Sequence, residues 1–559
     1  MFGYWQWSDR ILAGDWLGRD TYHPEFEWMS ALGDQSTWHR WWGDSRIFQQ
    51  EPMYPYMIAA GRSIGLSIAG LMLIQLLIGT LQPVATFWLT RMVFRQDAPA
   101  LIAAAIAGLY GPLIFYQGVM LRDWTGPLLD SLGLIALLWA LDQDRDWKWI
   151  WPGIVFGVAL MTRSIIMVFL PFMFAWVMWV NRENLSGMAR RAAVVAGGLL
   201  AGFSPLLLRN VLVGIAPFKI TNRLPEAIVS GNAADTFPLG MFVPPSMPEI
   251  LEKAQGSSYV AILESLKTYN GDWLAFVQMQ GLKFRGLLFP IELPNNLSFT
   301  YGQDISPVLS VLPDYSWLLP LGLLGVTLVV CPRRLDRRNA LLLVFGFATV
   351  LGLMAGLILG RYRLGLSSFL FVYAGWALWQ AWCWISMRCF RPLFLTIAAL
   401  AGMVVVQQVF VPIKTTNEGV FLDIHPASYK AASDIYVNRG QDDLAINEWI
   451  RLQSLAEELG DKFTADVAVK HQQELHVSMA FTFDNAGHSD LVNAHLSELD
   501  RLFDHRLDKS KRDFALGVTF LRLGRNDEAI MRLNKFIGEF PDLAEAEQAR
   551  QLVSELNQD

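Results

Sequence analysis

The chain has 559 residues, of which 53% are hydrophobic and 17% charged, a balance too apolar for a wholly soluble protein. Its formal net charge is −6 at pH 7 and it contains no long basic stripe, which argues against a nucleic-acid-binding surface. Its three cysteines lie outside residues 213–313 and the C-terminal region, so neither segment depends on a disulfide.

About ten apolar stretches predict a mostly α fold with a polytopic transmembrane helical domain. A membrane-spanning helix needs about 20 residues, so the two stretches around Arg163 are short and we expect them to tilt or to be partly re-entrant. The stretches run roughly over 67–90, 99–120, 124–141, 149–162, 164–180, 191–212, 314–331, 339–360, 364–387 and 391–412.

The short basic loops between these stretches predict the orientation of the chain. Arginines recur at 91–95, 182–191, 333–338 and 388–391, which fall on one side if each stretch crosses once, and that side is then cytoplasmic. The other side receives residues 1–66, the long loop 213–313 and everything after about 412. We therefore expect a multi-pass protein of the bacterial inner membrane, with its active face and its C-terminal domain outside the cytoplasm.

The N-terminal segment conflicts with this topology in one respect. It is polar and aromatic and contains neither a signal peptide nor a span, although the topology requires it outside. We expect one further transmembrane helix ahead of Met1 in the working protein. The predicted domains are an extracytoplasmic first loop with interfacial helices (1–66), a transmembrane domain (67–412) and a helical C-terminal domain (413–559).

The first loop contributes two candidate residues. Asp15 lies in an acidic, Trp-rich stretch beside the spanning domain and could act as a base, although a solvated acid on an interfacial helix is the plain alternative. Tyr54 lies in the sequence Pro-Met-Tyr-Pro-Tyr, a rigid turn leading into a helix along the membrane, and is a candidate for substrate binding.

The pair Arg122–Asp123 separates two apolar stretches at the outer lip. We expect Asp123 to position an incoming hydroxyl or to take its proton, with Arg122 beside it as a binding group. The alternative is a surface turn in which the two charges neutralise each other.

Four arginines at outer helix ends predict a cradle for a phosphate. Guanidinium groups match phosphate oxygens in charge and geometry, and charge near hydrocarbon is kept mainly where it serves function. The alternative is snorkelling toward lipid headgroups. The candidates are Arg163, Arg209 with its neighbour Asn210, Arg361 and Arg363. Asn232, in a loop rich in Asn, Gly and Thr, is a further candidate for substrate binding.

The C-terminal region is charged and helically periodic. Within it, Gly517, Gly524, Ala529 and Pro541 show the spacing of small residues that lets two tetratricopeptide helices approach closely. A tetratricopeptide-like domain would offer a surface for a protein partner, and a plain helical bundle is the alternative.

Read in order, the motifs YW–W–S–DRILAGDWLGRD, PMYPY, LYGPLIFYQGVMLRD, LMTRS, PLLLRN, SGNAAD, IELPNN and GRYRLGL resemble the bacterial dolichyl-phosphate-mannose–protein mannosyltransferase-like glycosyltransferases. The resemblance covers about residues 3–412. It implies an inverting transferase that moves a sugar from a polyprenyl-phosphate donor to an acceptor hydroxyl on a protein, lipid or glycan. It further implies that Asp123 is the acid of the third-to-fourth-helix turn, that Arg361 is the GRYR arginine, and that Arg209 and Asn210 are the RN pair.

Two departures and two alternatives accompany the resemblance. The first-loop acid of such enzymes precedes the YW segment and is not found in this chain, and residues 25–47 form a Trp- and Asp-rich insertion. A transporter or flippase of lipid-linked glycans would use the same arginines, and an inactive truncated scaffold would use only the tail. No cofactor follows from the residues, and the role of a divalent metal stays open.

Overall fold

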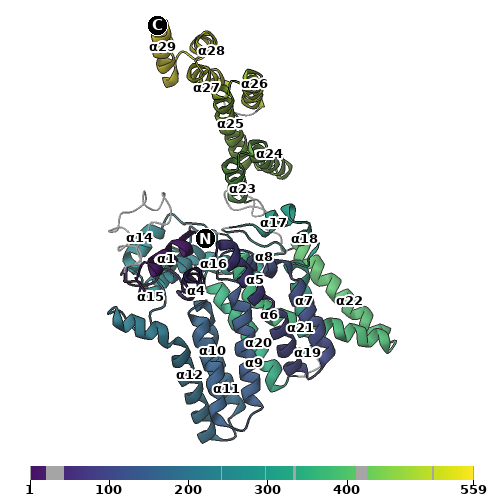
Figure 1. Ribbon diagram of the computed structural model, residues 1–559. Coiled ribbons are helices and arrows are strands. Elements are labelled where there is room, and N and C mark those ends of the chain that lie inside the picture. The colour runs from purple at the N-terminus through teal and green to yellow at the C-terminus, as the bar shows by residue number, and fades with distance from the viewer. Residues whose placement is uncertain are drawn as a thin grey trace. The chain divides into compact units, whose positions relative to one another are not determined.

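The structure is a computed structural model, shown in Figure 1. It describes residues 2–19, 43–240, 242–295, 297–331, 335–410, 425–505 and 509–557, so most of the insertion at 25–47 lies outside the described residues. The chain forms two compact units, Met1–Lys414 and Thr415–Asp559.

The first unit is helical, with a single isolated β-bridge between Leu239 and Ile358 in its described part. Its helices up to residue 212 are α1 (Phe2–Leu12), α4 (Met53–Ser63), α5 (Ile68–Gly79), α6 (Leu81–Phe94), α7 (Asp97–Leu109), α8 (Gly111–Gln117), α9 (Thr125–Leu141), η1 (Asp146–Trp149), α10 (Ile150–Leu160), η2 (Ser164–Val168), α11 (Phe169–Val180) and α12 (Leu185–Leu212). The later ones are α13 (Leu224–Asn232), α14 (Met247–Ala254), α15 (Ser258–Lys267), α16 (Trp273–Leu288), α17 (Phe299–Ile305), α18 (Pro307–Val311), α19 (Tyr315–Val330), α20 (Arg337–Ala355), α21 (Gly360–Ser386), α22 (Phe390–Val405) and the π-helical η3 (Val406–Phe410).

Helices occupy every apolar stretch of the sequence, which confirms the predicted all-α, multi-pass membrane class. In the described ranges, five helical segments are long and apolar enough to cross a bilayer, and six if α7 and α8, which meet at 53°, count as one broken span. The prediction of about ten crossings exceeds this number. The difference arises mainly because α9 and η2–α11 are short apolar helices and α10 has only 11 residues, too few to cross alone.

Helix α21 is the centre of this unit. All of its residues from Arg363 to Ala377 are buried, and it packs against α7, α9, α19 and α20. Elsewhere, α10 and α12 approach closely at glycines: a Cβ on Gly157 would lie 2.8 Å from the backbone nitrogen of Phe203, so only glycine fits there. This tight pair fixes the position of the turn that follows α10.

The two ends of the helical bundle differ in chemistry. At one end gather the N-terminus and the short helices α1, α4, α14 and α15 (Figure 1). The basic loops meet through contacts of their own: Arg338 pairs with Asp142 and donates to the Met92 carbonyl at 2.7 Å, while Arg191 pairs with Asp146 at 2.6 Å. Three of the four basic loops that the sequence assigns to one face, at 91–95, 182–191 and 333–338, therefore lie at the same end of the bundle.

The second unit consists of helices that pack against their neighbours in the chain. They are α23 (Pro426–Asn438), α24 (Asp442–Leu459), α25 (Lys462–Asn485), α26 (Ser489–His505), α27 (Lys509–Arg522), α28 (Asn526–Glu539) and α29 (Ala544–Leu556). A Cβ on Gly517 would lie 2.7 Å from Cγ of Leu533, so this glycine permits the close approach of α27 and α28. Assignment of the unit to the tetratricopeptide repeats stays a prediction.

Candidate active site

Asp123 lies in the turn between α8 and α9 and is almost fully buried, with 2% of its surface exposed. Its two carboxylate oxygens face two different arginines. Oδ1 lies 3.9 Å from Nη2 of Arg163, and Oδ2 lies 3.5 Å from Nη1 of Arg361. Three segments that are far apart in the sequence thus meet at one carboxylate.

Arg163 follows α10 and lies against the first turn of α9. A Cβ on Gly126 would lie only 3.0 Å from Cδ of Arg163, so this glycine lets the arginine stem pass. The guanidinium carbon lies 5.6 Å from the ring centre of Tyr362, and that of Arg361 lies 5.1 Å from the same ring. Tyr362 therefore stacks beside both arginines, as a cation–π partner does.

Glu51 completes the cluster and was not singled out from the sequence. It is 6% exposed, forms an ion pair with Arg122, and accepts hydrogen bonds from the backbone nitrogen and the hydroxyl of Ser164 at 2.8 and 2.7 Å. Burial alone would raise the pKa of Glu51, but the Arg122 charge and the Ser164 hydrogen bonds outweigh it and hold that pKa below its usual range. Glu51 therefore ties the turn before α9 to the turn after α10. We call Glu51, Arg122, Asp123, Arg163 and Arg361 the charge cluster.

Two tyrosines flank the charge cluster from the N-terminal segment. Burial raises the pKa of Tyr4 to about 12, so its hydroxyl stays protonated and donates to the side chain of Gln50. Tyr54 packs edge-on against Tyr4 with ring centres 5.1 Å apart, and its hydroxyl donates to Gln75 at 2.7 Å. Tyr54 thus supports Tyr4, and its own hydroxyl is occupied.

The RN pair, Arg209 and Asn210, makes contacts elsewhere. Nε of Arg209 donates to the Leu17 carbonyl at 2.6 Å, and its guanidinium lies 3.9 Å from the ring centre of Phe48. The Asn210 amide donates to the carbonyl of Lys219 at 2.7 Å. Both side chains hold the loops around the bundle end, and the structure does not bring them to Asp123.

Arg363 and Asp15 also make contacts outside the charge cluster. Arg363 has 1% of its side chain exposed and pairs with Glu292 at 3.2 Å, inside the protein. Asp15 accepts from the backbone nitrogen of Arg19 at 3.0 Å, as a residue capping a local turn does.

Asn232 lies at the end of α13 in a buried polar contact. Its side-chain oxygen accepts from Nζ of Lys283 at 2.9 Å, and its amide donates to the Ala355 carbonyl at 2.9 Å. Lys283 is 0% exposed and forms no ion pair with the described residues, and burial lowers its pKa from 10.5 to about 7.

This lysine predicts a pH dependence of stability. Between about pH 7 and 10.5 the unfolded chain holds the Lys283 proton and the folded chain does not, so the free energy of unfolding rises with pH in that window. The slope from this one group is at most about 1.4 kcal/mol per pH unit. Thermal unfolding of detergent-solubilised protein at pH 7, 8 and 9 should show a rising midpoint that flattens in Lys283→Met. Equal slopes for both proteins would contradict this prediction.

Fold and site define a multi-pass membrane protein with a buried, arginine-rich charge cluster at one end of its helices. Among the described residues, no group of three or more His, Cys, Asp and Glu side chains could hold a metal ion.

Residues 49–208 match the family described as dolichyl-phosphate-mannose-protein mannosyltransferase. The matched range contains all of the charge cluster except Arg361, and the match confirms the resemblance drawn from the motifs.

Solved structures and curated proteins give weaker comparisons. The apo oligosaccharyltransferase of Archaeoglobus fulgidus is 14% identical over 70% of this chain and 50% of that chain, with a TM-score of 0.36. The oligosaccharyltransferase AglB of Archaeoglobus fulgidus, in complex with an inhibitory peptide and a dolichol-phosphate, is 16% identical over the same shares, with a TM-score of 0.34. The chain thus spans about half the length of these structures. No curated protein matches the sequence.

Proposed function

We propose that this protein is an inverting membrane glycosyltransferase. It moves a sugar from a polyprenyl-phosphate donor to an acceptor hydroxyl on the extracytoplasmic face. The family match over residues 49–208 supports glycosyl transfer in a membrane, and the placement of the basic loops at the opposite end of the bundle supports the face.

One observation supports the donor class above the others: the charge cluster carries an excess of one positive charge. Its three guanidinium groups face two carboxylates, through the pairs Arg122–Glu51, Arg163–Asp123 and Arg361–Asp123. A sugar linked through a phosphodiester to a polyprenyl chain carries one negative charge, which balances that excess. Because buried charges are stable only when compensated, a monoanionic lipid phosphate fits this site better than a neutral donor.

The arginines also retain free hydrogen-bond donors. Nε of Arg361 is buried without a partner among the described residues, and the contacts of Arg163 and Arg361 with Asp123 are long, at 3.9 and 3.5 Å. A phosphate between the two guanidinium groups would give them the short, charge-assisted hydrogen bonds that Asp123 does not supply.

In the reaction we propose, Asp123 takes the proton of the acceptor hydroxyl as that oxygen bonds to the anomeric carbon. The bond from this carbon to the phosphate oxygen breaks, and the polyprenyl phosphate leaves with a second negative charge. The leaving phosphate needs no proton, because Arg163 and Arg361 stabilise the added charge. A single displacement from the opposite face inverts the anomeric centre.

The experiment that tests this proposal is sugar transfer by membranes that contain the protein. Radiolabelled polyprenyl-phosphate sugars are supplied with a total envelope extract as acceptor, and the label is followed into the acceptor fraction. Transfer that depends on the protein supports the proposal. Labelled donor that crosses the membrane without transfer would instead indicate a transporter and would contradict it.

Arg361→Ala is expected to weaken binding of the lipid phosphate by about tenfold to hundredfold, because a hydrogen bond to a charged group contributes about 1.5–3 kcal/mol. The dissociation constant of the polyprenyl phosphate is measured by its retention on protein in nanodiscs. Arg182→Ala, which removes an exposed arginine lying over Trp179, is the matched control and should bind as the unmodified protein does. Equal affinity of all three proteins would remove Arg361 from the phosphate site.

A further inference from the structure

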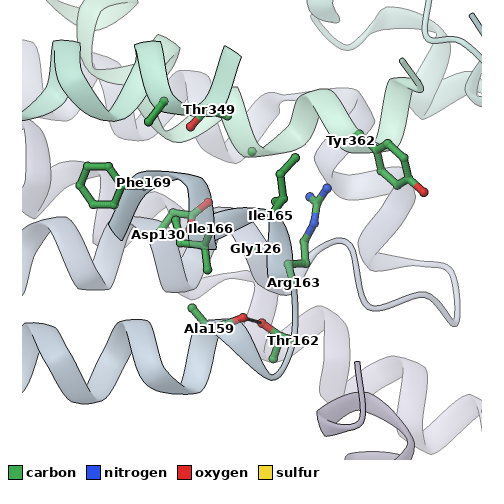
Figure 2. A pocket seen from close by; sticks show the side chains of 12 residues that line it. Gly126, Asp130, Ala159, Thr162, Arg163, Ile165, Ile166, Phe169, Thr349 and Tyr362 are labelled. Atoms are coloured by element: carbon green, nitrogen blue, oxygen red, sulfur yellow. Dashed lines mark hydrogen bonds between the residues drawn. The ribbon is translucent and has the colours of Figure 1, made fainter. Parts of the chain in front are cut away.

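A small cavity lies next to the charge cluster, between α9, the turn after α10, and α20. Its polar lining side chains are those of Asp130, Thr162, Arg163, Thr349 and Tyr362, and Phe169 and Ile166 lie on its apolar side (Figure 2). Its volume is about 20 Å³. Of the charge cluster, only Arg163 lines this cavity.

Asp130 is the unexplained residue of this cavity. It is 92% buried, with 8% of its surface exposed, and its side chain forms no hydrogen bond or ion pair with the described residues. On the other side, Nη1 of Arg163 is buried and also has no partner in the described part of the chain. A buried carboxyl group and a buried guanidinium nitrogen without hydrogen-bond partners are both costly, so both groups require a ligand that the cavity can hold.

The size of the cavity identifies that ligand. About 10–15 Å³ is enough for one water molecule, so 20 Å³ admits water, whereas a sugar ring or a phosphate is far too large. A buried water needs two to four polar partners. The hydroxyls of Thr162 and Thr349 donate to the carbonyls of Ala159 and Phe345 at 2.8 and 2.9 Å, which leaves their oxygens able to accept.

We propose that this cavity is a binding site for structural water and that Asp130, through this water, positions Arg163 for the donor phosphate. The second half of this proposal rests on the proposed function. Asp130 is a positioning residue, because it acts through Arg163 and lies in a cavity too small for the substrate.

The geometry of Arg163 explains why such an anchor is needed. Nη2 lies 3.9 Å from Asp123, too far for a hydrogen bond, so Asp123 attracts the guanidinium without fixing it. Nη1 lies on the α9 side, where a Cβ on Gly126 would be 3.4 Å away. If a water molecule holds Nη1, the Nη2 group of Arg163 stays available to the phosphate. Without that water, the guanidinium would move toward Asp123, and Nη2 would no longer be available to donate to the phosphate.

The kinetic test compares two substitutions of Asp130. Asp130→Leu removes the carboxyl group that binds the water. We expect the KM for the donor to rise about tenfold, while kcat stays within about threefold of that of the unmodified protein. Asp130→Asn keeps a hydrogen-bonding side chain and should stay within about threefold of the unmodified protein in both constants. In an Arg163→Ala background, Asp130→Leu should change neither constant further. A full additional rise in that background, or Asp130→Asn behaving as Asp130→Leu, would overturn the positioning role.

A second measurement does not depend on activity. An experimental structure that resolves ordered water should show density between Asp130 and Arg163, and the same density should be missing from Asp130→Leu. A cavity without water in the unmodified protein would overturn this inference whether or not the protein transfers sugar. If ordered water is present and no polyprenyl-phosphate sugar is transferred, the proposed function fails while the water site stands.

Discussion

Replacing Asp123 with Asn is expected to reduce turnover by about 10²- to 10⁴-fold, the usual contribution of a general base. The donor should still bind, because Asn removes a negative charge that competes with the phosphate for Arg163 and Arg361. The expected signature is therefore a low kcat with an unchanged or lower KM for the donor. Steady-state transfer from a labelled polyprenyl-phosphate sugar measures both constants.

The matched control for this substitution is Asp15→Asn. Asp15 is also an acid of the N-terminal segment, but it caps a local turn through the Arg19 amide and, within the described part of the chain, makes no hydrogen bond or ion pair with the charge cluster. Its replacement should leave both constants within about threefold of the unmodified protein. Near-normal turnover in Asp123→Asn, or a large loss of turnover in Asp15→Asn alone, would show that an acid other than Asp123 is the base.

The sequence predicted that Asp123 and several arginines lie at one end of the helical bundle, because charge beside apolar helices follows a simple rule. Arg122, Arg163 and Arg361 lie at the same end of their helices, and polar groups at one end of a helical bundle share a polar site. The positions of the helices were also predictable, because a long apolar stretch in a membrane has few stable structures other than a helix. The number of crossings was less predictable, because helix length and tilt depend on packing among the helices.

Glu51 could not be assigned in this way. It lies in a polar segment without periodicity, and its partners Arg122 and Ser164 are 71 and 113 residues away in the chain. The one signal in the sequence was that Glu51 directly precedes Pro52, at the start of the rigid turn into α4. Arg209 shows the converse difficulty: the sequence does not reveal that the Leu17 and Gly18 carbonyls already occupy its guanidinium.

Arg363→Ala is expected to destabilise the protein by about 3–5 kcal/mol, the usual cost of removing one partner from a buried ion pair. The partner left behind is Glu292, with 2% of its side chain exposed. The carbonyl of Phe289, which accepts from Arg363 at 2.5 Å, would also lose its donor. Against a typical total of 5–15 kcal/mol, this loss is a large fraction of the free energy of unfolding, so the yield of folded protein should fall.

Arg361→Ala is the matched comparison, because the two arginines are only two positions apart on one helix. Successive residues turn by about 100° around the axis, so Arg361 and Arg363 face nearly opposite sides of α21. One side faces Asp123 and the other faces Glu292. We therefore expect Arg361→Ala to fold and to lose donor affinity.

Fluorescence-detected size exclusion and thermal unfolding in detergent separate these outcomes. Arg363→Ala should give little monodisperse protein and a lower unfolding midpoint. Removing the charge on both sides, as in Arg363→Met with Glu292→Leu, should restore part of the folded yield, because no unpaired buried charge remains. If Arg363→Ala instead folded normally and lost donor affinity, both arginines of the GRYR motif would belong to the phosphate site. The ion pair with Glu292 would then not be the main role of Arg363.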